Sequence, residues 1–204
     1  MYKDITGIVL CGGKSSRFGE DKALIKLGDK ELIEVVSNLM LSLFPKVFLS
    51  TNESDKYKFL GLPLVKDIHH EKGPLAGIHA SLQDSETEKN FFIPVDMPLL
   101  NAEVVSSLIN YKTERQVVIF NNKGRDFPLC GVYKKSLFER IDQHFKHHVH
   151  DDIKTKNWYL SMQHFLSLIE VEVIKAELLP FYKEEYFLNI NSQQDYELIK
   201  AKLI

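Results

Sequence analysis

A polar loop near the amino terminus combines the residue types that bind the phosphates of a nucleotide. An apolar run ends at Leu10 and is followed by the paired glycines Gly12 and Gly13. Paired glycines let backbone amides approach a phosphate closely, and the nearby cations Arg17 and Lys22 supply the opposite charge. The structural alternative is a tight turn followed by a solvated lysine. The grouping of both cations in one loop favours phosphate binding.

Two common glycine-rich nucleotide motifs do not fit this loop. The dinucleotide fingerprint G-x-G-x-x-G needs separated glycines, whereas Gly12 and Gly13 are adjacent and the next glycine is Gly19. The Walker motif needs a glycine five positions before the glycine of Gly-Lys-Ser, but Ile8 stands there ahead of Gly13-Lys14-Ser15. The loop therefore belongs to another class of phosphate-binding segment.

A second chemical signal is Asp96, which follows the apolar segment Phe91–Val95. Pro98 restrains the chain shortly after it. In an open parallel sheet, a carboxylate in this position faces the ligand crevice, where it can hold Mg²⁺ against phosphates. The structural alternative is that Asp96 caps a helix that begins after Pro98.

A third signal is the loop from Asp67 to the Gly73-Pro74 pair. Proline is favoured in the first turn of a helix, so a helix is expected here, and its first backbone amides can face a base or an anion. His69 and His70 suggest a metal, but no further ligands follow them at an expected spacing. We therefore expect loop histidines rather than a zinc site.

Length and composition favour one soluble domain, residues 1–204. The chain is 44% hydrophobic and 26% charged, which allows it to bury a sizeable core. Its net charge of -2 gives no bulk attraction to nucleic acid, so a small-molecule partner is expected. Without a leader or an apolar stretch of roughly 20 residues, a cytoplasmic protein with no membrane partner is expected. Cys11 and Cys130 are expected to be packing residues in a reducing compartment.

Short apolar runs alternate with helical patterns, which predicts a parallel sheet with helices on both faces and a ligand crevice at the carboxyl ends of its strands. Strands are expected at Thr6–Cys11, Lys46–Thr51, Leu64–Lys66, Phe91–Val95, Gln116–Phe120, Phe127–Tyr133, Ile169–Ile174 and Phe187–Leu188. Helices are expected at Glu31–Phe44, Leu75–Leu82, Glu103–Tyr111, Lys134–Phe145, Asn157–Leu168 and Gln193–Leu203, the last capped by Ser192.

Four motifs occur in the order that is found in one enzyme family. They are Leu10–Lys22, Gly73–Gly77, Val95–Pro98 and Asn189–Asn191. With these motifs the chain resembles the molybdopterin nucleotidyltransferases, most closely the molybdenum cofactor guanylyltransferases, over nearly its whole length. The resemblance implies a three-layer α/β/α Rossmann-like nucleotidyltransferase fold with a mostly parallel sheet. It also implies a nucleotide-binding part at about 1–115 and an acceptor-binding part at about 116–204.

The resemblance implies roles for the residues that match the family motifs. The nucleotide-binding positions are Leu10, Cys11, Gly12, Gly13, Lys22, Asn52, Asp67 and Asp96, with Lys22 on the phosphates, Asp67 near guanine and Asp96 on Mg²⁺. The catalytic positions are Arg17, Lys22 and Asp96, and the acceptor-side positions are Asn189 and Asn191. The chain departs from the family pattern at three positions. Cys11 stands where alanine is usual, and Phe18 stands where methionine is usual. Ser50 stands where the family has an asparagine that contacts the nucleotide, and Asn52 follows two residues later.

The implied reaction transfers GMP from GTP to the terminal phosphate of molybdopterin and releases pyrophosphate, with Mg²⁺ as cofactor. Cofactor-delivery proteins and molybdoenzymes are candidate protein partners. Arg125–Leu129 and Lys146–His150 are candidates for acceptor contacts, the second with the alternative of a solvated helix end. Two other functions stay open: a cytidylyltransferase or sugar-phosphate nucleotidyltransferase, and a noncatalytic nucleotide- or cofactor-binding protein.

Overall fold

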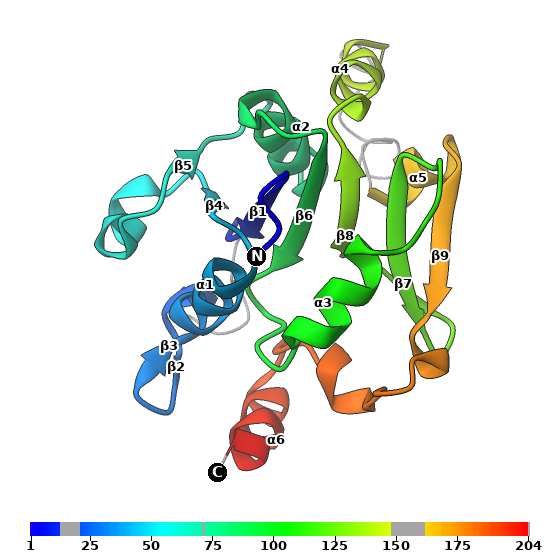
Figure 1. Ribbon diagram of the computed structural model, residues 1–204. Coiled ribbons are helices and arrows are strands. Elements are labelled where there is room, and N and C mark those ends of the chain that lie inside the picture. Colours follow the sequence, from blue (N-terminus) through cyan, green and yellow to red (C-terminus); the bar gives the residue numbers. More distant parts are fainter. Residues whose placement is uncertain (13–20, 71, 148–161, 204) are drawn as a thin grey trace, which may run out of the picture.

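Seven strands form one sheet in the middle layer of this computed structural model, which describes residues 1–12, 21–70, 72–147 and 162–203 (Figure 1). The strand order is β5-β4-β1-β6-β8-β7-β9. The strands are β1 (Ile5–Leu10), β4 (Lys46–Ser50), β5 (Leu64–Val65), β6 (Lys89–Pro94), β7 (Val117–Asn122), β8 (Arg125–Lys134) and β9 (Val171–Lys175). Within this sheet β8 runs antiparallel to both β6 and β7, and the other neighbouring strands pair in parallel. The expected mostly parallel sheet is confirmed.

Both faces of the sheet are buried because successive side chains of a strand point to opposite sides. In β1, Val9 packs on one side and Ile8 on the other, and both side chains are fully buried. Ile93 and Phe92 of β6 divide between the two sides in the same way. Apolar runs without polar alternation are typical of strands that are covered on both faces, which is why these strands could be predicted.

Helices cover both faces and complete the three layers (Figure 1). On the Val9 side lie α1 (Leu32–Leu43) and α3 (Ala102–Ile109), and on the Ile8 side lie α2 (Pro74–Asp84), α4 (Leu137–His147) and α5 (Met162–Ser167). The connections contain β2 (Lys26–Leu27), β3 (Lys30–Glu31), η1 (Lys22–Leu24), η2 (Ser54–Leu60), η3 (Ala176–Leu178) and η4 (Glu184–Phe187). Ser192 caps the last helix, α6 (Gln193–Leu203), because its Oγ accepts a hydrogen bond from the Asp195 amide at 3.2 Å. Across the described ranges, no helix has the length and apolar character needed to cross a membrane.

Gly7 lets α1 pack directly against β1. A Cβ atom at this position would lie 2.6 Å from Cδ2 of Phe44 and 2.8 Å from Cε of Met40, and both of these side chains are fully buried. Gly7→Ala is therefore expected to lower the free energy of unfolding by about 1–3 kcal/mol through overpacking. Urea unfolding followed by circular dichroism measures this change, and an unchanged midpoint would contradict the close packing.

Two interpretations of local structure are wrong. Phe187 and Leu188 do not form a strand; Phe187 ends η4 and packs edge-on against Phe120, so its apolar character serves the core. Asp96 does not cap a helix after Pro98, because α3 begins later and the side chain of Asn101 caps it by accepting from the amide of Val104 at 3.0 Å.

The helix expected at Asn157–Leu168 appears as α5 from Met162 onward. Its expected first residues, 157–161, lie outside the described ranges.

Candidate active site

The site residues predicted from separate parts of the chain gather at the carboxyl ends of β5, β4, β1 and β6. These strands are adjacent and parallel, so the loops that follow them share one edge of the sheet. Cys11 follows β1, Asn52 lies beyond β4, Asp67 beyond β5 and Asp96 beyond β6. This edge therefore collects polar groups from four loops.

Asp96 is the centre of a hydrogen-bonded group at this edge. Its Oδ2 accepts from Nζ of Lys22 at 2.8 Å, and its Oδ1 accepts from Nδ2 of Asn189 at 3.1 Å. Nζ of Lys22 also donates to Oδ1 of Asn191 at 3.1 Å. The side chains of Lys22 and Asp96 are 17% and 20% exposed, so the ion pair is largely shielded and still open to solvent. We call these four residues the Asp96 group.

The backbone holds the two asparagines of the Asp96 group in place. The amide of the fully buried Ile190 donates to the backbone carbonyl of Asp96 at 3.0 Å. Asn189 and Asn191 flank Ile190, and Oδ2 of Asp195 accepts from the amide of Asn191 at 2.9 Å. The residues predicted to lie on the acceptor side are thus in direct contact with the predicted catalytic residues.

Lys22 begins η1, and Asp21 fixes the position of that short helix. Oδ1 of Asp21 accepts from the amide of Ala23 at 3.1 Å, while its Oδ2 accepts from the hydroxyl of Tyr57 at 2.8 Å and from Nζ of Lys56 at 3.1 Å. Burial and the hydrogen bond to Asp21 raise the pKa of Tyr57, so the hydroxyl stays protonated and keeps donating. Tyr57 carried no signal in the sequence, because only the fold brings it to Asp21.

Asn52 and Asp67 form a second polar pair on the same edge. Nδ2 of Asn52 donates to Oδ2 of Asp67 at 2.8 Å, and its Oδ1 accepts from the amide of Asp67 at 3.0 Å. Helix α2 lies close beneath them, since a Cβ atom at Gly77 would lie 2.6 Å from Oγ of Ser50 and 3.5 Å from Oδ1 of Asp67. The glycine therefore lets α2 approach both loops.

At the end of β1, the backbone carbonyl of Leu10 and the backbone amide of Cys11 already form hydrogen bonds within the protein. The carbonyl of Leu10 accepts from the amide of Val95 at 3.1 Å, and the amide of Cys11 donates to the carbonyl of Ser50 at 2.9 Å. The Cys11 amide is therefore engaged in the fold. Burial raises the pKa of the Cys11 thiol, so the residue packs as a neutral group and is not a thiolate nucleophile.

The structure describes the two ends of the predicted phosphate-binding loop, up to Gly12 and again from Asp21 onward. Gly12 is exposed, and a Cβ atom there would meet no described atom within 4 Å. The predicted positions Gly13 and Arg17 lie outside the described residues, so their roles stay predictions.

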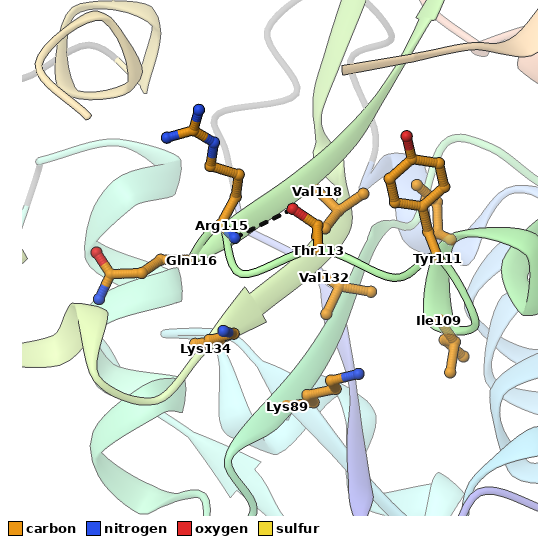
Figure 2. Close-up of a pocket in the computed structure, with 10 residues that line it drawn as sticks. Lys89, Ile109, Tyr111, Thr113, Arg115, Gln116, Val118, Val132 and Lys134 are labelled. Carbon is orange, nitrogen blue, oxygen red and sulfur yellow. Dashed lines mark hydrogen bonds between the residues drawn. The ribbon is translucent and has the colours of Figure 1, made fainter. Parts of the chain in front are cut away.

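A hollow on the opposite edge of the sheet is separate from these groups. Figure 2 shows Lys89, Thr113 and Lys134 around this hollow, near the amino ends of β6 and β7. The dashed line in the figure joins the Thr113 hydroxyl to the amide of Arg115, which donates to it at 3.1 Å. Ligands of open parallel sheets bind at the carboxyl ends of strands, so this edge is not the expected site.

Comparisons with known proteins address the family directly. Residues 7–158 match the family described as MobA-like NTP transferase domain. A protein of Carboxydothermus hydrogenoformans named "Probable molybdenum cofactor guanylyltransferase" is 34% identical over 197 residues, which cover 96% of this chain and 94% of that protein. A protein of Clostridium perfringens with the same name is 33% identical over 199 residues, which cover 96% of each chain.

Solved structures agree with the fold. A crystal structure of an Aquifex aeolicus protein has a TM-score of 0.75 at 28% identity and covers 92% of this chain and 94% of that chain. Molybdopterin-guanine dinucleotide biosynthesis protein A of Archaeoglobus fulgidus has a TM-score of 0.79 at 21% identity, with coverage of 97% and 98%. The expected Rossmann-like nucleotidyltransferase fold is thereby confirmed. The chain belongs to the MobA-like NTP transferase family and is a nucleotidyltransferase.

Proposed function

We propose that this nucleotidyltransferase transfers GMP from GTP to the terminal phosphate of molybdopterin and releases pyrophosphate. The observation that carries the proposal is the Lys22–Asp96 ion pair at the carboxyl edge of the sheet, in contact with Asn189 and Asn191. A carboxylate and a cation side by side suit a triphosphate with its metal ion. The names of the curated relatives support molybdopterin as the acceptor and a guanine nucleotide as the donor.

The Asp96 group fits a magnesium ion. Mg²⁺ prefers oxygen ligands, commonly one or two carboxylates with several waters. The group offers the carboxylate of Asp96 and Oδ1 of Asn191. Oδ1 of Asn189 is buried and lacks a hydrogen-bond partner among the described residues, so an oxygen beside Asp96 is left unsatisfied. A bound ion would supply positive charge next to the reacting and leaving phosphates.

The reaction needs no covalent enzyme intermediate. An oxygen of the terminal phosphate of molybdopterin forms a bond to the α-phosphorus of GTP, and the bond from that phosphorus to the α–β bridging oxygen breaks. The electron pair of the broken bond leaves with pyrophosphate. Lys22 exchanges its contact with Asp96 for the phosphates and stabilises the negative charge that develops on the leaving group. Asn189 and Asn191 orient the acceptor.

In this proposal the two parts of the chain divide the substrates. Residues at about 1–115 bind GTP through Lys22, Asp67 and Asp96, and residues at about 116–204 bind the acceptor through Asn189 and Asn191. Proteins that deliver molybdopterin or take up the product are the expected protein partners.

Asp67→Ala is expected to weaken GTP binding selectively. Guanine carries hydrogen-bond donors on its base-pairing edge, and the Asp67 carboxylate is an acceptor that Asn52 holds in place. Losing hydrogen bonds to a charged group costs about 1.5–3 kcal/mol, which corresponds to a roughly 10- to 150-fold rise in Kd. Calorimetric titration with GTP and with CTP measures both affinities, and CTP binding is expected to change little.

Asp55→Ala is the matched control, because the Asp55 side chain is 87% exposed and pairs with Lys58 on the surface. Equal losses of GTP and CTP affinity in Asp67→Ala would contradict base recognition by Asp67.

Pyrophosphate release tests the proposed function as a whole. Four reactions are measured in the presence of Mg²⁺, in which each nucleotide, GTP or CTP, is paired with each acceptor, molybdopterin or a sugar phosphate. Release restricted to GTP with molybdopterin supports the proposal, whereas release with CTP identifies a cytidylyltransferase and release with the sugar phosphate identifies that acceptor. Membership of a nucleotidyltransferase family argues against a noncatalytic binding protein.

A further inference from the structure

A second cluster of ligand-type side chains joins three elements that are far apart in the sequence. It consists of His69 after β5, His79 in α2 and Asp142 in α4. Nε2 of His69 and Nε2 of His79 lie 3.8 and 3.7 Å from Oδ1 of Asp142, which is too far for hydrogen bonds. One ligand atom from each residue lies within 4.8 Å of the others. No further ligands follow His69 and His70 at an expected spacing in the sequence, but the fold brings His79 and Asp142 from other elements close to His69.

Three of the four histidine nitrogens in this cluster are buried without a hydrogen-bond partner among the described residues. His79 is 1% exposed, and neither of its ring nitrogens has a hydrogen-bond partner within the described part of the chain. Nε2 of His69 is also buried and has no hydrogen-bond partner among the described residues. A buried polar atom without a partner costs about 1–3 kcal/mol, and proteins retain few of them. Two imidazoles that face one carboxylate across a gap are satisfied together by a cation placed between them.

We propose that His69, His79 and Asp142 bind a divalent transition-metal ion of the Zn²⁺ class. Imidazole nitrogens with a carboxylate suit Zn²⁺ better than Mg²⁺, which prefers oxygen ligands alone. Ligand atoms around a tetrahedral zinc ion lie roughly 3.3 Å apart, so the distances of 3.8 and 3.7 Å from the two histidine nitrogens to Oδ1 of Asp142 would each shorten by about half an ångström. The side chains of His69 and Asp142 are 26% and 24% exposed, which lets water reach the fourth ligand position.

At His79 and Asp142 the surroundings favour the protonation states that a metal requires. Burial lowers the pKa of His79 to about 4, and the neighbouring His69 acts in the same direction, so the ring is neutral at neutral pH. A hydrogen bond from Lys146 lowers the pKa of Asp142. Lys146 contacts Oδ2 of Asp142 and leaves Oδ1 facing the histidines.

Aromatic packing holds both histidine rings in position. The ring of His79 stacks on Phe138 with centroids 4.6 Å apart, and the ring of His69 lies 4.6 Å from that of Phe145. Phe138 and Phe145 belong to α4, the helix that carries Asp142. The site is therefore organised before an ion binds, and a bound ion joins the loop after β5 and helix α2 to α4.

Titration of the full chain with Zn²⁺ tests the site. The protein used is the full chain with the triple substitution His147→Ala/His148→Ala/His150→Ala, because this histidine-rich stretch can bind metals adventitiously. Excess Mg²⁺ is present to occupy the Asp96 group. After treatment with a chelator, we expect calorimetry to show one tightly bound Zn²⁺ per chain. Co²⁺ in place of Zn²⁺ is expected to give the visible absorption bands of a four-coordinate ion. Loss of all Zn²⁺ binding in this variant would show that binding was adventitious.

Substitutions of the ligands then locate the site. Asp142→Asn and His69→Ala in the same background are expected to weaken Zn²⁺ binding by more than about 100-fold, beyond the usual effect of changing a residue that only supports a ligand. His70→Ala is the matched control, since His70 is the exposed neighbour of His69. Lys146→Ala removes a positive charge that would repel a bound cation at this cluster, and it is expected to strengthen binding. Unchanged affinity in Asp142→Asn, with the fold verified by circular dichroism, would overturn the proposal.

Discussion

Lys22→Ala is expected to lower the turnover number for pyrophosphate release by about 100- to 1000-fold while the protein stays folded. Removing a preorganised donor that stabilises transition-state charge costs roughly 3–4 kcal/mol, which is the same factor in rate. Lys22 lies in the short helix η1, and its ammonium group reaches Asp96 and Asn191 at 2.8 and 3.1 Å. Steady-state pyrophosphate release with GTP and molybdopterin measures the loss.

Two companion variants show whether charge and position both matter at Lys22. Lys22→Arg retains the positive charge in a broader, planar group and is expected to recover part of the rate. Lys30→Ala is the matched control, because Lys30 is an exposed lysine in the nearby strand β3. A turnover number for Lys22→Ala close to that of the unchanged protein would show that the phosphates bind elsewhere.

Asp96→Ala is expected to reduce turnover by a similar factor of about 100- to 1000-fold and to remove the saturable dependence of the rate on Mg²⁺. The Asp96 carboxylate accepts from both Lys22 and Asn189, so its loss removes the centre of the Asp96 group. The free energy of unfolding is expected to fall by only about 1 kcal/mol, since water still reaches the partly shielded ion pair and pairs in contact with solvent contribute little.

The initial rate measured against Mg²⁺ concentration tests this role. Asp96→Asn keeps the shape of the side chain and removes its charge, so it separates metal binding from packing. Asp29→Ala serves as the control because Asp29 is an exposed carboxylate between β2 and β3. A normal Mg²⁺ dependence in Asp96→Asn would assign the metal to other residues.

The part of the fold that follows from local sequence is the sheet. Runs such as Ile8-Val9 and Phe92-Ile93 contain no polar alternation, which is typical of short strands that are buried on both faces. The observed limits of β1 and β6 lie within one or two residues of the expected ones. Phe187 was misread because an apolar residue suits a strand and a 3₁₀ turn equally, and its packing against Phe120 is set by the whole core.

The residues of the candidate site also divide into those that local sequence predicts and those that only the fold brings together. Asp96 and Gly12 could be predicted because each follows a strand, where open sheets bind ligands. The contact between Lys22 and Asn191 joins residues 169 positions apart, and only the family resemblance brought both to one site in advance. His79 and Asp142 could not be paired from sequence, since their approach depends on how α2 packs against α4.

The hairpin between β7 and β8 also escaped prediction. Both strands were expected, but their direct pairing was not. Lys123 and Gly124 adopt positive φ values of 50° and 85°, the backbone conformation that two-residue hairpin turns require. The asparagine and glycine on either side of Lys123 were the available signal.

The reversed direction of β8 places a hairpin turn, as well as the ends of parallel strands, at the edge of the sheet that carries the Asp96 group. Its first residues pair with the last residues of β7, as Arg125 does with Asn122, so the turn at Lys123 lies at the edge where the neighbouring parallel strands end. The hydroxyl of Tyr182 donates to Oδ1 of Asn122 at 2.8 Å, and Lys123 pairs with Glu184, which anchors the turn from outside the sheet. Residues inserted at this turn would therefore change the surface beside β7 while the register of β1 with β4 and β6 stays the same.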